Sequence, residues 1–322
     1  MNAPRLRLRA VDRLLELGDR PWLMGIVNAS PDSFSDGGRR ASIEDQIALA
    51  GELLGAGADI VDIGGESAST GRRPVAPEQE IERVVPLVEA VAGELGALVS
   101  VDTYKPSVAR AAIAAGARIV NDVSGLRDRE LADVCARSGA ALVVMHTLAA
   151  PRERLQDPRL YGDIATEVLE FLRDRIAVAL DHGVRAEQLI VDPGPDFAKT
   201  PAQTVRLLRD VGSLHELGRP LLMAISRKDF VGALTGRPPG SRLAGTLAAV
   251  AHGVRQGAHI FRVHDVAAVA DFLAVYAALE GDLPPDEDLL LAEELRHEPV
   301  APGDTRPRER LHGHEEAGRS SR

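Results

Sequence analysis

The sequence has very few cysteines and no excess of positive charge. Its 322 residues include a single cysteine, Cys135, so no disulfide can form within the chain, which favours a reducing, cytoplasmic environment. Cys135 stands among apolar residues and is expected to pack in the core rather than act as a nucleophile. The formal net charge of −10 argues against general nucleic-acid binding, although a local basic pocket for a small anion remains compatible with it.

Long apolar runs and aromatic residues are scarce as well. No run approaches the length of about 20 residues that a helix needs to cross a bilayer, so no membrane partner is expected. Residues 1–19 lack the apolar centre of a signal peptide, and their alternating Arg and Leu predict a short strand that closes one end of the fold. Because only 3% of residues are aromatic, the core must be built from Leu, Val, Ile and Ala, which the apolar content of 45% allows.

Apolar runs alternate with segments of helical period between residues 20 and 281. The apolar runs are nearly continuous, which is typical of parallel strands covered on both faces. They occupy residues 22–27, 59–63, 98–101, 118–121, 140–145, 189–191, 220–225 and 259–263. The helical segments occupy residues 42–54, 77–95, 106–115, 129–138, 163–182, 200–214, 241–256 and 266–279. This alternation over about 250 residues predicts an α/β fold, a (β/α)8 TIM barrel. An open doubly wound sheet is the alternative, but no G-x-G-x-x-G motif follows the first strand.

The C-terminal region differs in composition from the barrel. Residues 282–298 are acidic and are compatible with one more short helix, whereas residues 299–322 are rich in proline, glycine and charge and predict a disordered tail. His297, His312 and His314 could form a metal-binding tract, but a solvated tail explains these histidines more simply.

A polar group stands at or just after the end of every apolar run. The groups are Asn28; Asp62 with residues 64–67; Asp102 with Thr103; Asn121 with Asp122; His146 with Thr147; residues 192–194; residues 226–228; and Arg262 with His264 and Asp265. Each group alone fits a turn or a helix cap. In a barrel, however, the C-terminal ends of all strands meet at one face, so their combination predicts a functional site there.

These groups divide into two chemical kinds. Asp102, Asn121 and Asp192 offer acceptors for the N–H edges of a flat heterocycle. Lys228, Arg262 and His264, together with helix N-termini, suit phosphate oxygens. The combination predicts a phosphorylated heterocyclic substrate.

The same residues carry a resemblance to a known family. Residues 24–38, MGIVNASPDSFSDGG, are similar to the first signature of dihydropteroate synthases, and residues 62–67, DIGGES, resemble the start of the second. Further motifs follow in family order: SVDTYKP at 100–106, NDVSG at 121–125, DPG at 192–194, SRK at 226–228, GTLAA at 245–249 and RVHDV at 262–266. The resemblance covers about residues 20–280 and implies a pterin-binding TIM barrel.

The resemblance also implies roles for single residues. The pterin would be bound by Asp102, Asn121, Met145, Asp192, Phe197 and Lys228, and the pyrophosphate by Asn28, Arg262 and His264. Asn28 would hold Mg²⁺ on the pyrophosphate, and Lys228, Arg262 and His264 would be catalytic. The implied reaction condenses 6-hydroxymethyl-7,8-dihydropterin pyrophosphate with 4-aminobenzoate. The products are 7,8-dihydropteroate and pyrophosphate. The resemblance also implies that the enzyme is a homodimer.

Three departures from the family pattern stand near the expected site. The family usually reads Thr-Arg-Pro-Gly after Glu-Ser, whereas residues 68–71 read Ala-Ser-Thr-Gly, so Arg72 or Arg73 would have to replace the lost arginine. The usual Gly-Phe-Gly-Lys reads Asp-Phe-Ala-Lys at residues 196–199, and Ala224 replaces a glycine.

These departures leave two alternatives to a working synthase. One is a noncatalytic or impaired pterin-binding paralogue with a regulatory or scaffolding role. The other is a methyltransferase that uses a folate methyl donor, against which stand the loop at residues 31–38 and the SRK motif.

Overall fold

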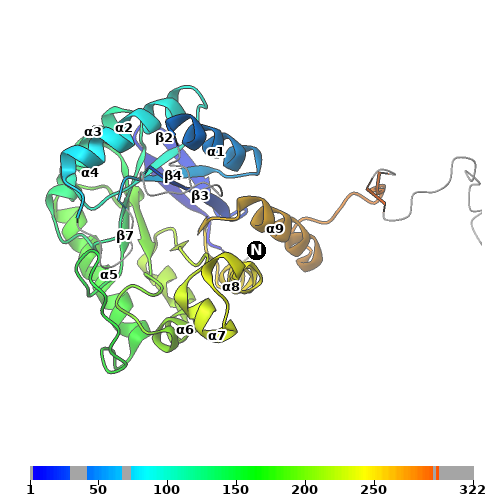
Figure 1. Cartoon of the computed structure of the whole chain (residues 1–322). Helices are drawn as coiled ribbons and strands as arrows, with labels where there is room; N and C mark the ends of the chain where they lie inside the picture. The colour runs from blue at the N-terminus through cyan, green and yellow to red at the C-terminus, as the bar shows by residue number, and fades with distance from the viewer. Residues whose placement is uncertain (1–2, 30–41, 67–73, 293–294, 297–322) are drawn as a thin grey trace, which may run out of the picture.

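The computed structural model describes residues 3–29, 42–66, 74–292 and 295–296. Its parallel strands are β3 (Trp22–Asn28), β4 (Ile60–Gly64), β5 (Val99–Asp102), β6 (Ile119–Asp122), β7 (Ala141–Met145), β8 (Leu189–Asp192), β9 (Leu222–Met223) and β10 (Ile260–Val263). They form one 8-stranded sheet in the order β8-β7-β6-β5-β4-β3-β10-β9. A parallel bridge between Val191 and Leu221 joins the two edges, so the sheet closes into the predicted TIM barrel (Figure 1).

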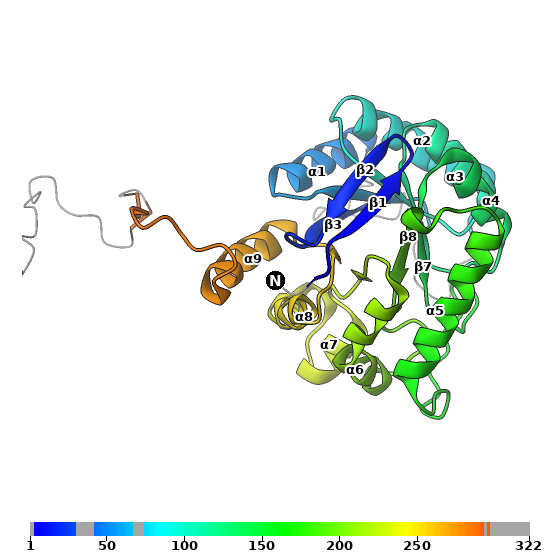
Figure 2. The same cartoon turned by 180° about the vertical axis from the view of Figure 1, so that it is seen from behind.

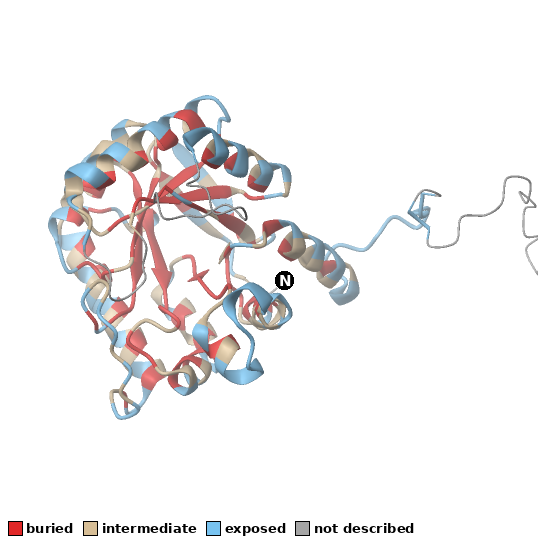
Figure 3. Cartoon of the chain, in the orientation of Figure 1, coloured by how far each residue is buried: buried red, intermediate tan, exposed pale blue. Residues whose placement is uncertain are grey.

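Helices cover the outside of this barrel. They are α1 (Ile43–Gly55), α2 (Pro77–Gly93), α3 (Pro106–Ala114), α4 (Glu130–Ser138), α5 (Ile164–Asp181), α6 (Pro201–Arg209), α7 (Asp229–Thr235), α8 (Leu243–Arg255) and α9 (Val266–Glu280). Local sequence explains their ends: Ser42 and Asp45 cap α1 reciprocally, for example, and Gly139 ends α4 with a positive φ of 78°. Their inner faces are buried and their outer faces exposed (Figure 3).

Three helical segments differ from the sequence prediction. The helix expected over residues 200–214 ends at Arg209 and continues as a 3-10 turn, Val211–Leu217, in which Ser213 bonds to the Asp210 carbonyl through both its N–H and its hydroxyl. Helix α7 was not predicted, because its 7 residues are too few to show a helical period. Residues 282–292 form no helix and are exposed, so the helix expected there is wrong over that stretch.

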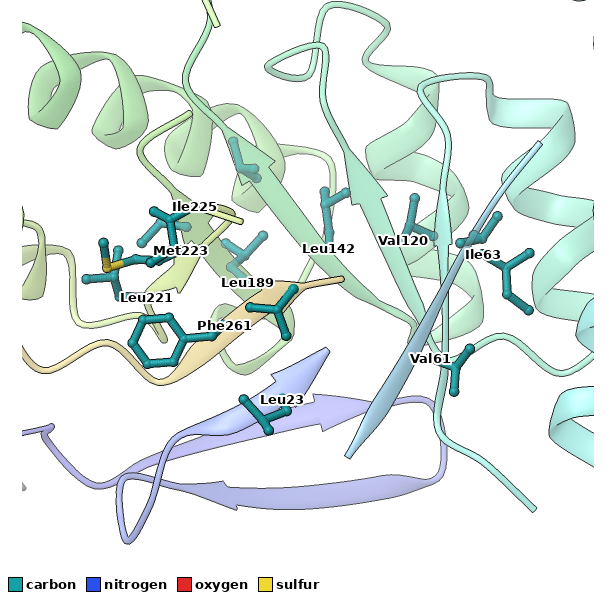
Figure 4. Close-up of a cluster of buried hydrophobic side chains, with 14 of the residues drawn as sticks. Leu23, Val61, Ile63, Val120, Leu142, Leu189, Leu221, Met223, Ile225 and Phe261 are labelled. Carbon is teal, nitrogen blue, oxygen red and sulfur yellow. The ribbon is translucent and has the colours of Figure 1, made fainter. Parts of the chain in front are cut away.

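Side chains on the strands alternate between two apolar layers. One set points outward and packs against the helices, including Leu23, Val61, Val120, Leu142 and Phe261 (Figure 4). The other set fills the lumen, including Met24, Ile60, Ile119, Val143 and Ile260. Because both faces of each strand are covered by apolar layers, the runs are apolar throughout. Cys135 lies on helix α4, packs in the outer layer and is buried as predicted.

The N-terminal segment closes the bottom of the barrel. It forms not one strand but an antiparallel hairpin, β1 (Leu6–Ala10) and β2 (Arg13–Leu17), that lies across the barrel (Figure 2). Leu8, Ala10 and Leu17 join the lumen cluster. The lumen is thus filled with apolar side chains at this end, and a ligand can enter only from the other.

No helix within the described ranges is long and apolar enough to span a membrane.

The hairpin gives a direct stability prediction. Leu8 is 0% exposed, so Leu8→Ala should open a cavity in the floor and lower the free energy of unfolding by about 2–4 kcal/mol. Leu14→Ala is the matched control, because Leu14 lies in the same hairpin with 47% of its surface exposed. Urea denaturation of both variants measures the difference, and equal losses would show that the hairpin does not seal the barrel.

Candidate active site

The upper end of the lumen holds a cluster of charged side chains, of which Asp62 is fully buried and Asp102 and Arg262 are mostly buried. Arg262 on β10 donates from Nε to Asp62 Oδ2 on β4 at 2.6 Å and from Nη2 to Asp102 Oδ2 on β5 at 2.8 Å. Asn121 on β6 donates from Nδ2 to the same Asp62 oxygen at 3.2 Å. The strand ends therefore bring together three residues predicted for the site, Asp102, Asn121 and Arg262, around Asp62.

Burial changes the acidity of the two carboxylates predicted to bind the heterocycle. Burial raises the pKa of Asp102 to about 7. The positive charge of Arg262 lowers this pKa in part, whereas the negative charge of Asp62 raises it further. Burial raises the pKa of Asp192 to about 6, against the N–H of Gly194 and the charge of Lys228. Both groups consequently titrate close to neutral pH.

Asp192 and Met145 lie side by side at the ends of β8 and β7, where they are partners in the strand register. The Asp192 carboxylate accepts a bond of 2.7 Å from the N–H of Gly194. Gly194 has a φ of 63°, and a Cβ there would lie 2.1 Å from the carbonyl oxygen of His146. Only glycine fits this position, so the Asp-Pro-Gly motif fixes the direction of the Asp192 side chain.

Lys228 lies over an aromatic ring. Its Nζ is 4.4 Å from the centroid of the Phe197 ring, a cation–π distance, which joins two further predicted residues. Burial lowers the pKa of Lys228, while the nearby carboxylates Asp196 and Asp192 counteract this effect.

His264 is held at the end of β10 by Ser226. Its Nδ1 is 3.0 Å from the Ser226 Oγ. Burial, with the charges of Arg227 and Arg262, lowers the pKa of His264 to about 4, so the imidazole is neutral at pH 7 and can offer a hydrogen bond but no charge to an anion. Arg227 binds Asp265 through Nε and Nη2 and so ties the loops that carry Lys228 and His264.

A cavity of about 520 Å³ opens at this end of the barrel. Of the predicted site residues, those that line it are Asp102, Phe197, Lys228, Arg262 and His264. Asn28, Asn121, Met145 and Asp192 stand at strand ends but are not among the lining residues of this cavity. The volume suits a bicyclic ring with a further substituent.

Comparison with known proteins agrees with this geometry. The family model described as pterin binding enzyme matches residues 24–264. The dihydropteroate synthase of Synechocystis sp. is 41% identical over 268 residues, covering 83% of this chain and 92% of that protein. The solved Xanthomonas albilineans dihydropteroate synthase with 4-aminobenzoic acid is 43% identical with a TM-score of 0.79, covering 86% of this chain and 99% of that one. The enzyme of Escherichia coli is 38% identical over 273 residues, covering 85% of this chain and 96% of its own.

The chain belongs to the dihydropteroate synthase family.

Part of the site that the synthase signatures predict lies outside the described residues. The first loop, residues 30–41, and the departure at residues 68–71, with Arg72 and Arg73, are in this part. The substitution of Arg72 or Arg73 for the lost arginine therefore stays a prediction.

The sequence does not indicate one buried network beside the cavity, although Glu66 belongs to the second synthase signature. Glu66 accepts bonds of 2.9 Å from Tyr104, Lys105 and the N–H of Val75, and it pairs with Arg152. Burial acts to raise the pKa of Glu66, but these donors outweigh it and lower the pKa overall. Arg152 comes from a loop far along the chain, so no local pattern links it to Glu66.

Lys199 is a second residue whose place the sequence did not indicate. This lysine of the family motif is 0% exposed, and its Nζ contacts His146 Nδ1 at 2.8 Å and the carbonyls of Gly194 and Phe197 at 2.9 and 3.0 Å. Burial lowers its pKa to about 7. It holds the loop after β8 in shape rather than facing the cavity.

The departures at residues 196–199 keep the backbone that glycine would adopt. Asp196 has a φ of 67° and Ala198 a φ of 50°, both in the left-handed region that favours glycine. Ala198 therefore costs strain of about 1 kcal/mol. Ala224, the third departure, lines the cavity and is 8% exposed, so its methyl group occupies space that the family glycine leaves open.

The charge cluster predicts a strong effect of removing one carboxylate. Asp62→Ala leaves the Arg262 guanidinium without one of its two carboxylates and should lower the free energy of unfolding by about 3 kcal/mol. Glu130→Ala breaks the exposed pair with Arg110, in which both side chains are more than half exposed, and should cost less than about 1 kcal/mol. Thermal or urea unfolding compares the two variants, and a loss for Asp62→Ala as small as the control would contradict the central role of the cluster.

Proposed function

We propose that this chain catalyses the dihydropteroate synthase reaction. In that reaction, 6-hydroxymethyl-7,8-dihydropterin pyrophosphate and 4-aminobenzoate give 7,8-dihydropteroate and pyrophosphate. The observation that carries the proposal is that Asp102, Lys228 and Arg262 line one cavity at one end of a barrel of this family, with Asp192 at the neighbouring strand end. Solved relatives include a Xanthomonas albilineans enzyme in complex with 7,8-dihydropteroate.

The carboxylates are proposed to bind the pterin ring. Asp102 and Asp192 accept hydrogen bonds from its N–H and amino groups, and Asn121, held by Asp62, completes the edge. Met145 beside Asp192 and Phe197 beneath Lys228 supply apolar contact to the ring. Lys228 donates to the ring carbonyl.

The cationic side is proposed to stabilise the leaving pyrophosphate. Arg262 contributes a guanidinium that Asp62 and Asp102 already orient, and neutral His264 contributes a hydrogen bond. Asn28 ends β3 with an exposed side chain at the same end of the barrel. These preset donors favour negative charge on the departing oxygen.

Mg²⁺ is the proposed cofactor, and the donors present suit it. No group of three or more His, Cys, Asp or Glu in the described ranges could hold a metal by itself. Mg²⁺ is commonly held by one or two protein oxygens together with substrate phosphates. Asn28 would supply the protein oxygen, and the bound ion would neutralise charge on the pyrophosphate.

The chemical step exchanges one bond for another at the pterin methylene carbon. The C–O bond to pyrophosphate breaks and its electron pair leaves with the pyrophosphate. The amine nitrogen of 4-aminobenzoate forms the new C–N bond and loses a proton. The electron-rich ring supports the cation-like carbon, so the enzyme needs leaving-group stabilisation and exclusion of water more than a strong base.

Several further expectations rest on the resemblance or on the sequence. They are the homodimer, the cytoplasmic location, and the division into residues 1–19, 20–281 and 282–322, and they stay predictions. The relatives described for this chain are dihydropteroate synthases, so they do not support the methyltransferase alternative.

Pyrophosphate release tests the proposed reaction. The full chain with Mg²⁺ and 6-hydroxymethyl-7,8-dihydropterin pyrophosphate should release pyrophosphate in a manner that depends on 4-aminobenzoate and yields dihydropteroate. Lys228→Ala should reduce the rate by about two powers of ten, as expected for the loss of a charged contact in the transition state. Pterin binding by calorimetry without any turnover would instead identify the chain as a noncatalytic paralogue.

Pterin binding should depend on pH because of the two carboxylates. Both must be ionised to accept hydrogen bonds from the ring, and their pKa values are about 7 and about 6. Protonation below these values replaces an acceptor by a donor, so affinity should be highest above about pH 8 and fall steadily towards pH 5. Calorimetry with 6-hydroxymethyl-7,8-dihydropterin measures the profile. Asp192→Asn, which cannot titrate, should bind less tightly and show a shallower profile, whereas constant affinity of the unaltered protein would refute these roles.

A further inference from the structure

The loop after β8 and the start of α7 are joined through one carboxylate. Asp196 Oδ2 accepts bonds from the N–H of Asp229 at 2.5 Å and of Phe230 at 3.4 Å, and Thr204 donates its hydroxyl to Asp196 Oδ1 at 3.1 Å. Asp229 and Phe230 are the first two residues of α7. Asp196 therefore satisfies amides that the first turn of any helix leaves unpaired.

This cap replaces one that α7 does not provide for itself. The residue before the helix is Lys228, and its side chain makes no capping hydrogen bond. Ser, Thr, Asp or Asn usually stand at that position, so the cap here comes from a different loop. The Lys228 carbonyl also accepts a bond of 3.1 Å from Arg242 Nη1, so Asp196 and Arg242 together hold the backbone at Lys228.

The same loop also holds the other end of the lysine. Phe197, next to Asp196 in the chain, places its ring 4.4 Å from Lys228 Nζ. Asp196, Phe197, Lys228 and Asp229 all line the cavity. Adjacent residues of one loop thus contact both the backbone end and the ammonium end of Lys228.

We propose that Asp196 is a positioning residue for Lys228: its carboxylate fixes the start of α7 and faces the lysine, so that the ammonium is held charged over the Phe197 ring. The proposal deepens the proposed function and rests on it, since Lys228 is the residue assigned there to the pterin carbonyl.

The charges around Lys228 agree with this role. The groups that face it are Asp192, Asp196 and Lys199 from β8 and its loop, Asp229 from α7, and Arg262 and His264 from β10 and its end. Burial, Arg262 and Lys199 favour the neutral amine, whereas the carboxylates favour the ammonium. Among these carboxylates, Asp196 has the largest effect in raising the pKa of Lys228.

The backbone at this position permits a clean test. Asp196 has a φ of 67°, which Asp, Asn and Gly all tolerate. Asp196→Asn keeps an acceptor for the α7 amides and removes the charge. Asp196→Gly removes both and restores the residue that the family pattern carries. Asp229→Asn is the control for the loss of one nearby charge, because the Asp229 side chain is 68% exposed and its carboxylate pairs with Arg242 at 3.2 Å rather than with the α7 amides.

Two measurements on the full chain separate the cap from the charge. Labelling of Lys228 by acetic anhydride across pH, read by peptide mass spectrometry, gives the pKa of its amine. This pKa should fall by roughly one unit in Asp196→Asn and Asp196→Gly and by less than half of that in Asp229→Asn. Hydrogen exchange of the α7 amides should be about tenfold faster in Asp196→Gly, with protection largely retained in Asp196→Asn.

The outcomes separate this proposal from the proposed function. Neither measurement needs turnover, so both give an answer even in a chain that releases no pyrophosphate. If turnover occurs, the basic limb of its pH profile should move to lower pH in Asp196→Asn, which a purely structural role would not cause. The same labelling pKa for Lys228 in the unaltered protein and both Asp196 variants would overturn the proposal, as would equal α7 exchange in Asp196→Gly and the unaltered protein.

Discussion

The pairing of Arg262 with Asp62 and Asp102 is the interaction on which the site depends. It joins β10 to β4 and β5, strands that are 200 and 160 residues away in sequence. A guanidinium in this position is stable only if the barrel closes and brings both carboxylates to it, because an unpaired buried charge is costly. The pairing thus makes a folded barrel and an ordered site mutually dependent.

The lumen is apolar at the hairpin end and charged at the C-terminal ends of the strands, where this pairing lies. The hairpin and the lower halves of the strands fill the lumen mainly with apolar side chains, and the charged groups of the site stand toward the C-terminal ends. Low polarity beneath the cluster raises the pKa of Asp102 and Asp192 towards neutrality and lowers that of His264. The chemical properties of the site therefore derive from burial as much as from residue identity.

Contacts between loops adapt this common plan to the present chain. Lys199 and the Arg227–Asp265 pair tie loops together beside the cavity, and Asp196 caps a helix that has no cap of its own. The departures at residues 196 and 198 keep a backbone suited to glycine, so the chain changes the chemistry of this loop without changing its path. Only the contacts explain why a carboxylate is useful there.

The sequence by itself determined the order of strands and helices and the polar residue at the end of each strand. Apolar runs, helical period and glycine at helix ends are local signals, and a barrel with Asp102, Asn121, Asp192, Lys228 and Arg262 at one face follows from them. Helix α7 was not predicted, because its 7 residues are too few to show a helical period. Only the tertiary structure decided which groups meet: Arg262 with Asp62, Arg152 with Glu66, and Asp196 with the first amides of α7. Such pairs arise from the closure of the ring and the packing of distant loops, and pKa values depend on burial, neither of which is recorded in the order of neighbouring residues.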